Sequence, residues 1–248
     1  MNELDINGYK LEICSNSFYS AKQAQLGGAS RVELCQNLEN GGTTPSYAQI
    51  KLVRNALSIG VHVLIRPRSG DFLYNEEEFL EMQEDVKLCK EIGCDGVVIG
   101  ILTQDGEVDI DRMKVLIELA QPMTVVFHRA FDKCKDPFKS LEDVISIGCN
   151  RILTSGQANT AFQGKALLKE LILRANNRIE IMPGSGVDSS NVVDILEFTG
   201  AKSIHSSAKI VIDSNMKVLE NEVQGMDEPV MYSSKEKVQE IVDKIKSL

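Results

Sequence analysis

Short apolar runs rich in β-branched residues alternate with longer stretches of helical periodicity along the chain. Eight such runs, each bounded by turn-forming residues, are predicted to be strands: residues 11–16, 31–37, 61–68, 96–102, 124–131, 151–157, 178–184 and 203–209. Their starts lie about 20 to 35 residues apart, which is the spacing of strand–helix units in α/β proteins. The hydrophobic pattern therefore predicts an unbroken alternation of strands and helices.

The stretches between the predicted strands carry helix start and stop signals. Ser46 and Asn75 each precede a helical stretch as amino-terminal caps, and Asp136 with Pro137 opens another in the same way. A glycine just before the next strand is predicted to end four of the helices: Gly60, Gly93, Gly148 and Gly200.

Eight strand–helix units in one chain are most simply arranged as a closed (β/α)8 TIM barrel. The alternative is an open, doubly wound sheet, which usually has a glycine-rich first turn. Here the first turn reads SNSFYS and has no GxGxxG pattern. We therefore predict an α/β fold in which residues 1–248 form a single TIM-barrel domain.

The end of the chain departs from the regular alternation. Residues of about 210–232 make a longer connection than an ordinary eighth loop, and residues 233–247 have the pattern of a final helix. The long connection is expected either to fold over one mouth of the barrel or to take part in oligomer contacts.

Alternate residues of a barrel strand point inward, and the outer face must meet apolar helices. Polar residues that alternate with Leu, Val and Ile are therefore predicted to face the interior. In the first three strands the inward set is Glu12, Cys14, Glu33, Cys35, His62, Leu64, Arg66 and Arg68. The later strands add His128, Arg129, Thr154, Ser155, Gln157, Glu180 and His205.

So many ionisable groups inside a barrel must pair with one another or with a ligand, because an isolated buried charge costs several kcal/mol. One interpretation is a network of Glu12, Glu33 and Arg66 that holds the barrel together. Arg68 and His128 lie nearer the carboxyl ends of their strands, where barrel enzymes place their sites.

The loops after the seventh and eighth strands suggest an anion site at the same end. Gly184 and Gly186 follow the seventh strand, and Ser206 ends the eighth. Glycines let backbone N–H groups approach anionic oxygens, and these two loops form the usual phosphate site of barrels. With Arg66, Arg68, Arg129 and Ser155, these residues form the predicted anion-binding set. A glycine turn also connects strands to helices without any ligand.

Cys14 and Cys35 are predicted at matching positions on neighbouring parallel strands, roughly 5 Å apart in backbone spacing. Two thiolates at one point suit Cu(I) far better than magnesium or calcium. The alternative is that both are small buried hydrophobic residues. The other cysteines fall on helices or at their ends, and no CxxC pair indicates a zinc finger or a thioredoxin-like site.

The net charge and the amino-terminal sequence restrict the cellular location and the classes of binding partner that are expected. The formal net charge is −9 and the pI is near 5.0, without a basic stripe, so nucleic acid and anionic membranes are not expected as partners. The amino terminus has neither the basic region nor the apolar run of a signal peptide, and the sequence predicts a cytoplasmic protein.

With these residues in view, the sequence resembles the CutC family, named for copper homeostasis. The matching motifs are LEICSNS, RVELCQNLENGGTTPS, IRPRSGDFLY, CDGVVIGILTQDGEVD, VVFHRAFD, RILTSGQ and IMPGSGV, between about residues 10 and 209. The resemblance implies a TIM barrel, a cytoplasmic location, a homo-oligomer such as a dimer or tetramer, and copper binding. It also implies Cys14 and Cys35 as ligands.

Two hypotheses follow. In the first, Cys14 and Cys35 bind Cu(I) in a homeostasis protein, and Glu12 or Glu33 tunes the thiolates. In the second, the barrel is an enzyme for a small anionic or phosphorylated metabolite, which the predicted arginines hold while His128 moves a proton with Glu33 or Glu12. A barrel that serves mainly as an oligomeric scaffold is a third possibility.

Overall fold

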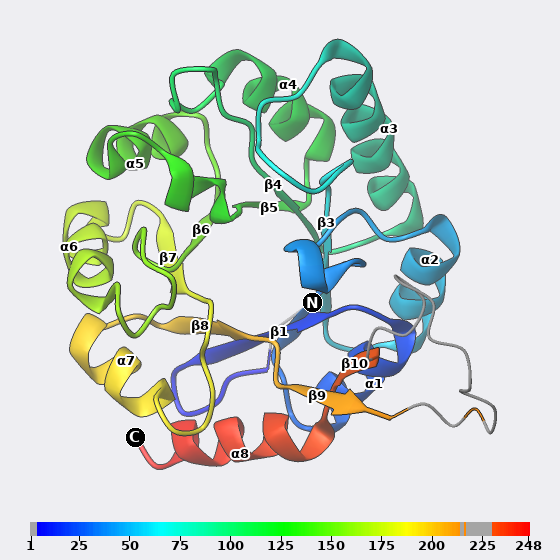
Figure 1. Cartoon of the computed structure of the whole chain (residues 1–248), viewed down its shortest axis with the longest axis vertical. Helices are drawn as coiled ribbons and strands as arrows, with labels where there is room; N and C mark the ends of the chain where they lie inside the picture. Colours follow the sequence, from blue (N-terminus) through cyan, green and yellow to red (C-terminus); the bar gives the residue numbers. More distant parts are fainter. Residues whose placement is uncertain (1–3, 214–215, 217–229) are drawn as a thin grey trace.

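A ring of eight parallel strands forms the centre of the molecule in the computed structural model, which describes residues 4–213, 216 and 230–248 (Figure 1). The strands are β1 Lys10–Ser15, β2 Arg31–Leu34, β3 Gly60–Leu64, β4 Gly96–Ile99, β5 Thr124–Phe127, β6 Arg151–Thr154, β7 Glu180–Pro183 and β8 Ser203–Ser206. Each begins within two residues of its predicted start and ends one to four residues before its predicted end.

The order of the strands around the sheet is β7-β6-β5-β4-β3-β2-β1-β8. Strand β1 pairs in parallel with both β2 and β8, so the first and last strands of the barrel are neighbours. Strands β7 and β8 lie side by side at the two ends of this order and nearly close the ring (Figure 1). The prediction of a (β/α)8 TIM barrel is confirmed, because an open doubly wound sheet would not pair its first strand with its last.

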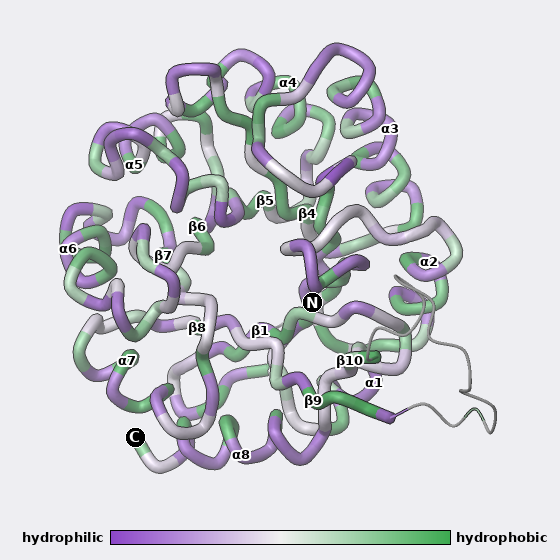
Figure 2. The backbone as a smooth tube through the Cα atoms, in the orientation of Figure 1, coloured by the Kyte–Doolittle hydropathy of each residue, from purple (hydrophilic) through white to green (hydrophobic). Residues whose placement is uncertain are grey.

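Helices surround the strands on the outside of the ring (Figure 1). They are α1 Phe18–Leu26, α2 Tyr47–Ala56, α3 Glu76–Ile92, α4 Ile110–Ala120, α5 Pro137–Ser146, α6 Lys165–Ala175, α7 Val192–Thr199 and α8 Lys235–Lys246. Two short 3-10 helices, η1 Leu38–Asn40 and η2 Arg129–Lys133, follow β2 and β5. Hydrophilic and hydrophobic residues alternate along the helices, which is typical of amphipathic packing (Figure 2).

Most of the predicted helix signals act where they were expected. The side chains of Ser46, Asn75 and Asp136 cap α2, α3 and α5, and Gly93 ends α3 in the left-handed conformation. The expectation for Gly60 was wrong, because α2 already ends at Ala56 and Gly60 is the first residue of β3. An added Cβ there would lie 3.1 Å from the Cβ of Arg31, so this glycine serves close strand packing.

The described part of the long connection near the carboxyl terminus contains a pair of antiparallel strands, β9 Lys209–Ile212 and β10 Val230–Ser233. Strand β10 is joined to the barrel through Ser233, whose hydroxyl donates to the carbonyl of Cys14 at 3.2 Å. The remainder of the predicted 210–232 loop, residues 214–215 and 217–229, lies outside the described residues. Helix α8 lies within the stretch 233–247 that the pattern marked as helical.

The main hydrophobic core lies between the strands and the surrounding helices. A smaller apolar cluster lies inside the ring and consists of Cys14, Cys35, Leu64, Val98, Val126, Leu153 and Met182. Within the described ranges, every helix is too short or too polar to cross a lipid bilayer.

Candidate functional site inside the barrel

A fully buried carboxylate, Glu12 of β1, lies at the centre of a polar layer inside the barrel. Its Oε2 accepts a hydrogen bond from Nε of Arg31 at 2.6 Å, and its Oε1 lies 2.8 Å from Nδ1 of His205. Nδ1 of His62 lies 3.5 Å from Oε2. Burial by itself would raise the pKa of Glu12, but the charge of Arg31 and the two imidazoles outweigh it and hold the pKa well below its usual range. Glu12 is therefore an ionised counter-charge.

His205 of β8 joins this layer to the space above it. Burial opposes protonation of the imidazole, but its contacts with Cys14 and Glu12 and the charges of Glu33 and Glu12 raise its pKa well above the usual value. Because Glu12 is ionised, Nδ1 of His205 donates to it. The other ring nitrogen, Nε2, lies 3.8 Å from Oε2 of Glu33.

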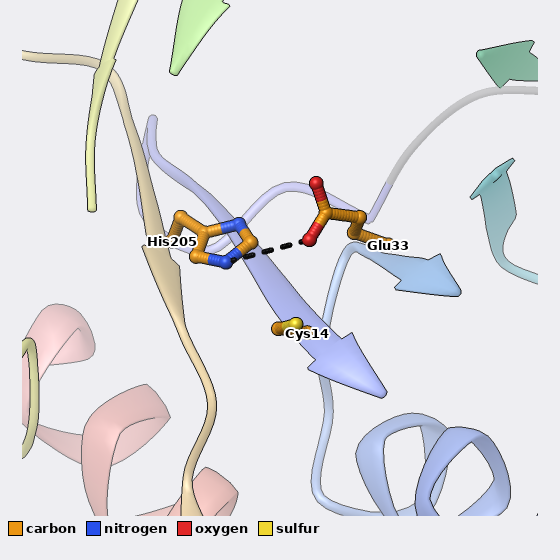
Figure 3. A group of neighbouring side chains, drawn as sticks. All are labelled: Cys14, Glu33 and His205. Atoms are coloured by element: carbon orange, nitrogen blue, oxygen red, sulfur yellow. Dashed lines mark ion pairs between the residues drawn. The ribbon is translucent and has the colours of Figure 1, made fainter. Parts of the chain in front are cut away.

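Cys14, Glu33 and His205 come together from three strands (Figure 3). One possible metal-ligating atom from each side chain lies within 4.8 Å of the others, and all three residues are buried. The pKa of the Cys14 thiol is raised well above its usual value, first by its contact with Cys35 and then by burial. Burial also raises the pKa of Glu33, against the charge of His205.

The sulfur atoms of Cys14 and Cys35 lie 3.5 Å apart. Their predicted placement at matching strand positions was wrong, because the partner of Cys14 in the β1–β2 register is Glu33. Cys35 follows the end of β2, and its N–H donates to the carbonyl of Ser15. The stagger between barrel strands brings the sulfurs together diagonally instead of directly across.

A cavity of about 400 Å³ opens above this group, at the carboxyl ends of the strands. That end of a barrel carries the site in TIM-barrel enzymes. The lining residues are Cys14, Glu33, Leu38, Gly41, Leu64, Arg66, Phe72, His128, Arg129, Leu153, Ser185, Gly186, His205, Ser206, Ser207 and Lys209.

Arg66 lines the cavity but does not pair with the glutamates. Its guanidinium donates to the carbonyls of Asn40, Gly42 and Gly70, at 3.1, 2.7 and 2.7 Å. The expected network of Arg66 with Glu12 and Glu33 is therefore not formed. Arg66 instead fixes the GGTTPS loop over the barrel mouth, because the N–H donors of its planar guanidinium reach carbonyls of this loop and of the loop after β3 at once.

Arg68, also predicted to hold an anion, lies outside the cavity. Its Nε donates to Glu78 at 2.6 Å, and one terminal nitrogen lies 2.9 Å from Oδ1 of Asp71. The structure brings it to the start of α3, where it fastens the loop that follows β3.

Arg129 and Ser155 are connected through Asp132. Nε of Arg129 donates to Asp132 at 2.7 Å, and the same guanidinium reaches the hydroxyl of Ser155 at 3.1 Å. Asp132 also accepts the backbone N–H groups of Ser155 and Gln157. Arg129 lines the cavity, whereas Ser155 is buried behind it and holds the loop after β6.

Only some of the predicted glycine and serine residues after β7 and β8 line the cavity. Gly186 and Ser206 line the cavity, whereas Gly184 does not and instead lies against Leu153 and His205. The Ser206 hydroxyl already donates to the carbonyl of Val187 at 2.6 Å. Lys209, the first residue of β9, also lines the cavity and was not among the predicted site residues.

Arg31 is a second functional side chain that the sequence reasoning missed. It lies two residues before Glu33, so strand alternation alone places it on the same inward face. Arg31 is fully buried and neutralises Glu12, the role that Arg66 was expected to fill.

A sequence model of the CutC family matches residues 9–210. The chain belongs to the CutC family. A CutC protein of Parabacteroides distasonis is 49% identical over 238 residues, which cover 96% of this chain and 98% of that protein. A CutC protein of Bacteroides fragilis is 45% identical over 248 residues, with 98% of each chain covered.

A solved structure agrees with this assignment. The crystal structure of CutC from Streptococcus agalactiae, described as a candidate copper homeostasis protein, aligns with a TM-score of 0.77 and 38% identity, covering 80% of this chain and 98% of that one. Thiamine phosphate pyrophosphorylase from Pyrococcus furiosus aligns with a TM-score of 0.61 at 14% identity, covering 97% of each chain. The second likeness concerns the barrel fold alone.

Proposed function

We propose that this CutC protein binds Cu(I) between Cys14 and Cys35, as part of copper homeostasis. The observation that carries the proposal is the 3.5 Å separation of the two sulfurs inside the barrel. Thiolates and imidazole are soft or intermediate ligands that suit Cu(I), whereas magnesium and calcium prefer oxygen. The ligand set would be the two sulfurs, with the imidazole of His205 as a further ligand beside Cys14, because Cys14, Glu33 and His205 each offer a ligand atom within 4.8 Å of the others.

The surroundings of His205 support this role. Glu12 accepts a hydrogen bond from Nδ1, which leaves Nε2 for a metal once its proton is lost. A carboxylate behind a ligating histidine is the usual arrangement in metal sites, because it fixes the orientation of the ring. Glu33, on the other side of Nε2, can take up a proton that the ion displaces.

An anaerobic titration with Cu(I) against a competing chelator tests the proposal. One tightly bound ion per chain is expected for the native protein, and the Cys14→Ser, Cys35→Ser double variant should lose it. A matched control replaces Cys134 and Cys149, two buried cysteines outside the cavity, and should bind as the native protein does. Equal affinities for all three proteins would refute the copper site.

Location and assembly are part of the same proposal. A cytoplasmic homo-oligomer, a dimer or a tetramer, is what membership of the family implies. Cell fractionation and light scattering of the purified protein test these two points. A periplasmic protein or a monomer would contradict them.

A second candidate function is an enzyme that acts on a small anionic or phosphorylated metabolite. The observation that favours it is the basic lining of the cavity. Among the described lining residues, Arg66, Arg129 and Lys209 carry positive charge, whereas Glu33 is the single carboxylic acid. In crystals grown with phosphate, anion density between Lys209 and Arg129 would support an enzyme of this class. A cavity filled only by water at saturating phosphate would count against it.

A further inference from the structure

His128 has one ring nitrogen fixed and the other free. The residue follows β5, and its Nδ1 accepts the backbone N–H of Ala130 at 3.1 Å. A nitrogen that accepts a hydrogen bond carries no proton, so in the neutral ring the proton is on Nε2. The fold thereby selects one tautomer and makes Nε2–H a donor.

The ring is also held in place by packing. Its centroid lies 5.0 Å from that of Phe72 on one side. On another side it lies against Gly100, where an added Cβ would come within 2.5 Å of both Nδ1 and Cε1. Any side chain at position 100 would collide with the imidazole. With glycine there, the ring packs directly against the backbone after β4 and has little room to rotate.

The free nitrogen has no acceptor in the described part of the protein. Nε2 of His128 is buried without a hydrogen-bond partner, and the residue is 4% exposed. Leaving a buried donor without an acceptor is unfavourable, because the group has lost its hydrogen bond to water and gained none in return. His128 lines the 400 Å³ cavity, so an acceptor atom of a ligand in that cavity would remove the cost.

The charges around the cavity indicate which kind of ligand would supply an acceptor atom for Nε2 of His128. Lys209 makes no ion pair within the described ranges, in contrast to Arg129, which is paired with Asp132. Arg66 adds a second positive charge, since its partners are carbonyls and not carboxylates. The cavity therefore has an excess of positive charge that an anionic group can neutralise.

We propose that His128 is a fixed hydrogen-bond donor whose Nε2–H donates to an oxygen of a small organic anion, and that the charged group of this anion lies near Lys209. The inference rests on the second candidate function and defines its ligand as a carboxylate or phosphate ester that carries a further acceptor oxygen. Burial and the charge of Arg66 lower the pKa of His128 to about 3, so the ring stays neutral. His128 therefore polarises an oxygen and does not shuttle a proton, unlike the role considered from the sequence.

Nitrogen NMR of the ¹⁵N-histidine-labelled protein tests this directly, because the chain has only three histidines. The free protein is expected to show the Nε2–H tautomer of His128 with no titration between pH 5 and 8. Addition of 2-phosphoglycolate should shift the Nε2–H resonance of His128, whereas glycerol should not. A His128 that titrates in this range, or that has its proton on Nδ1, would overturn the inference.

Variants distinguish the role of His128 from the proposal that the cavity binds an anionic metabolite. His128→Phe and Lys209→Met should each weaken 2-phosphoglycolate binding at least tenfold, whereas Lys202→Met, the same charge change outside the cavity, should not. Unchanged affinity in His128→Phe would overturn the role of His128 alone. Absence of binding to the native protein would overturn both proposals. If His128→Phe does not fold, Gly100→Ala displaces the ring instead and should give the same loss.

Discussion

Nδ1 of His205 lies 2.8 Å from Oε1 of Glu12, deep inside the barrel. The residues come from the last and first strands of the ring, and the contact joins the buried Glu12–Arg31 pair to the cavity above. The polar layer therefore has two functions. It balances charges where most barrels have apolar side chains, and it orients the imidazole that faces Cys14 and Glu33.

Removal of the Glu12 charge should strongly destabilise the protein. In Glu12→Gln the fully buried guanidinium of Arg31 loses the carboxylate that its Nε contacts, and breaking a buried ion pair typically costs about 3–5 kcal/mol. Urea unfolding followed by circular dichroism measures the change. Glu142→Gln is the control, because its ion pair with Arg178 lies on the surface, and its unfolding midpoint should stay near that of the native protein. A loss in Glu12→Gln no larger than in the control would contradict the prediction.

The stability of the metal-free protein should depend on pH through His205. Its pKa in the folded protein is raised above the ordinary value of 6.5, so its contribution is complete below pH 6.5 and is lost as the pH rises through the folded value. The free energy of unfolding of the native protein should therefore exceed that of His205→Gln most at low pH. Unfolding curves at several pH values, with a chelator present, measure this difference. A difference that grows toward alkaline pH would have the wrong sign.

Cu(I) binding should release protons. The pKa of Cys14 is raised well above 9.0, so the thiol is protonated near neutral pH and must lose its proton to become a ligand. The apparent affinity should then rise about tenfold per pH unit for each proton released. A weakly buffered titration with a pH indicator measures the release. Binding without proton release, at an affinity that does not change with pH, would be inconsistent with a thiolate site.

Loss of Arg66 should expose Cys35. The guanidinium of Arg66 holds the loop that contains Gly42, and Gly42 lies against the side chain of Cys35, which is fully buried. In Arg66→Met we expect alkylation of Cys35 by N-ethylmaleimide to become at least tenfold faster, as measured by mass spectrometry of the peptides. Arg68→Met removes a guanidinium that fastens the neighbouring loop and serves as the control. The same rate in both variants would show that Arg66 does not close this loop.

The amino-acid sequence by itself determined the barrel and the inward direction of its polar residues. Strand alternation and helical periodicity are local properties, and so are caps such as Asn75 with Glu78, which are three residues apart. These patterns depend on the backbone of one segment and can be predicted without knowledge of its neighbours. Glu12, Cys14, Glu33 and His205 could for this reason be assigned to the interior from the pattern alone.

Only the tertiary structure decided which of these inward residues contact one another. The stagger of the strands places Cys14 opposite Glu33 in the register and still brings the Cys14 sulfur next to that of Cys35. It also places Glu12 opposite Arg31, with which it forms an ion pair. Arg66 is bound by carbonyls of loops whose course depends on the whole barrel. The physical reason is that a buried charge takes the partner that geometry brings within about 3 Å, and that choice is made by segments far apart in the chain.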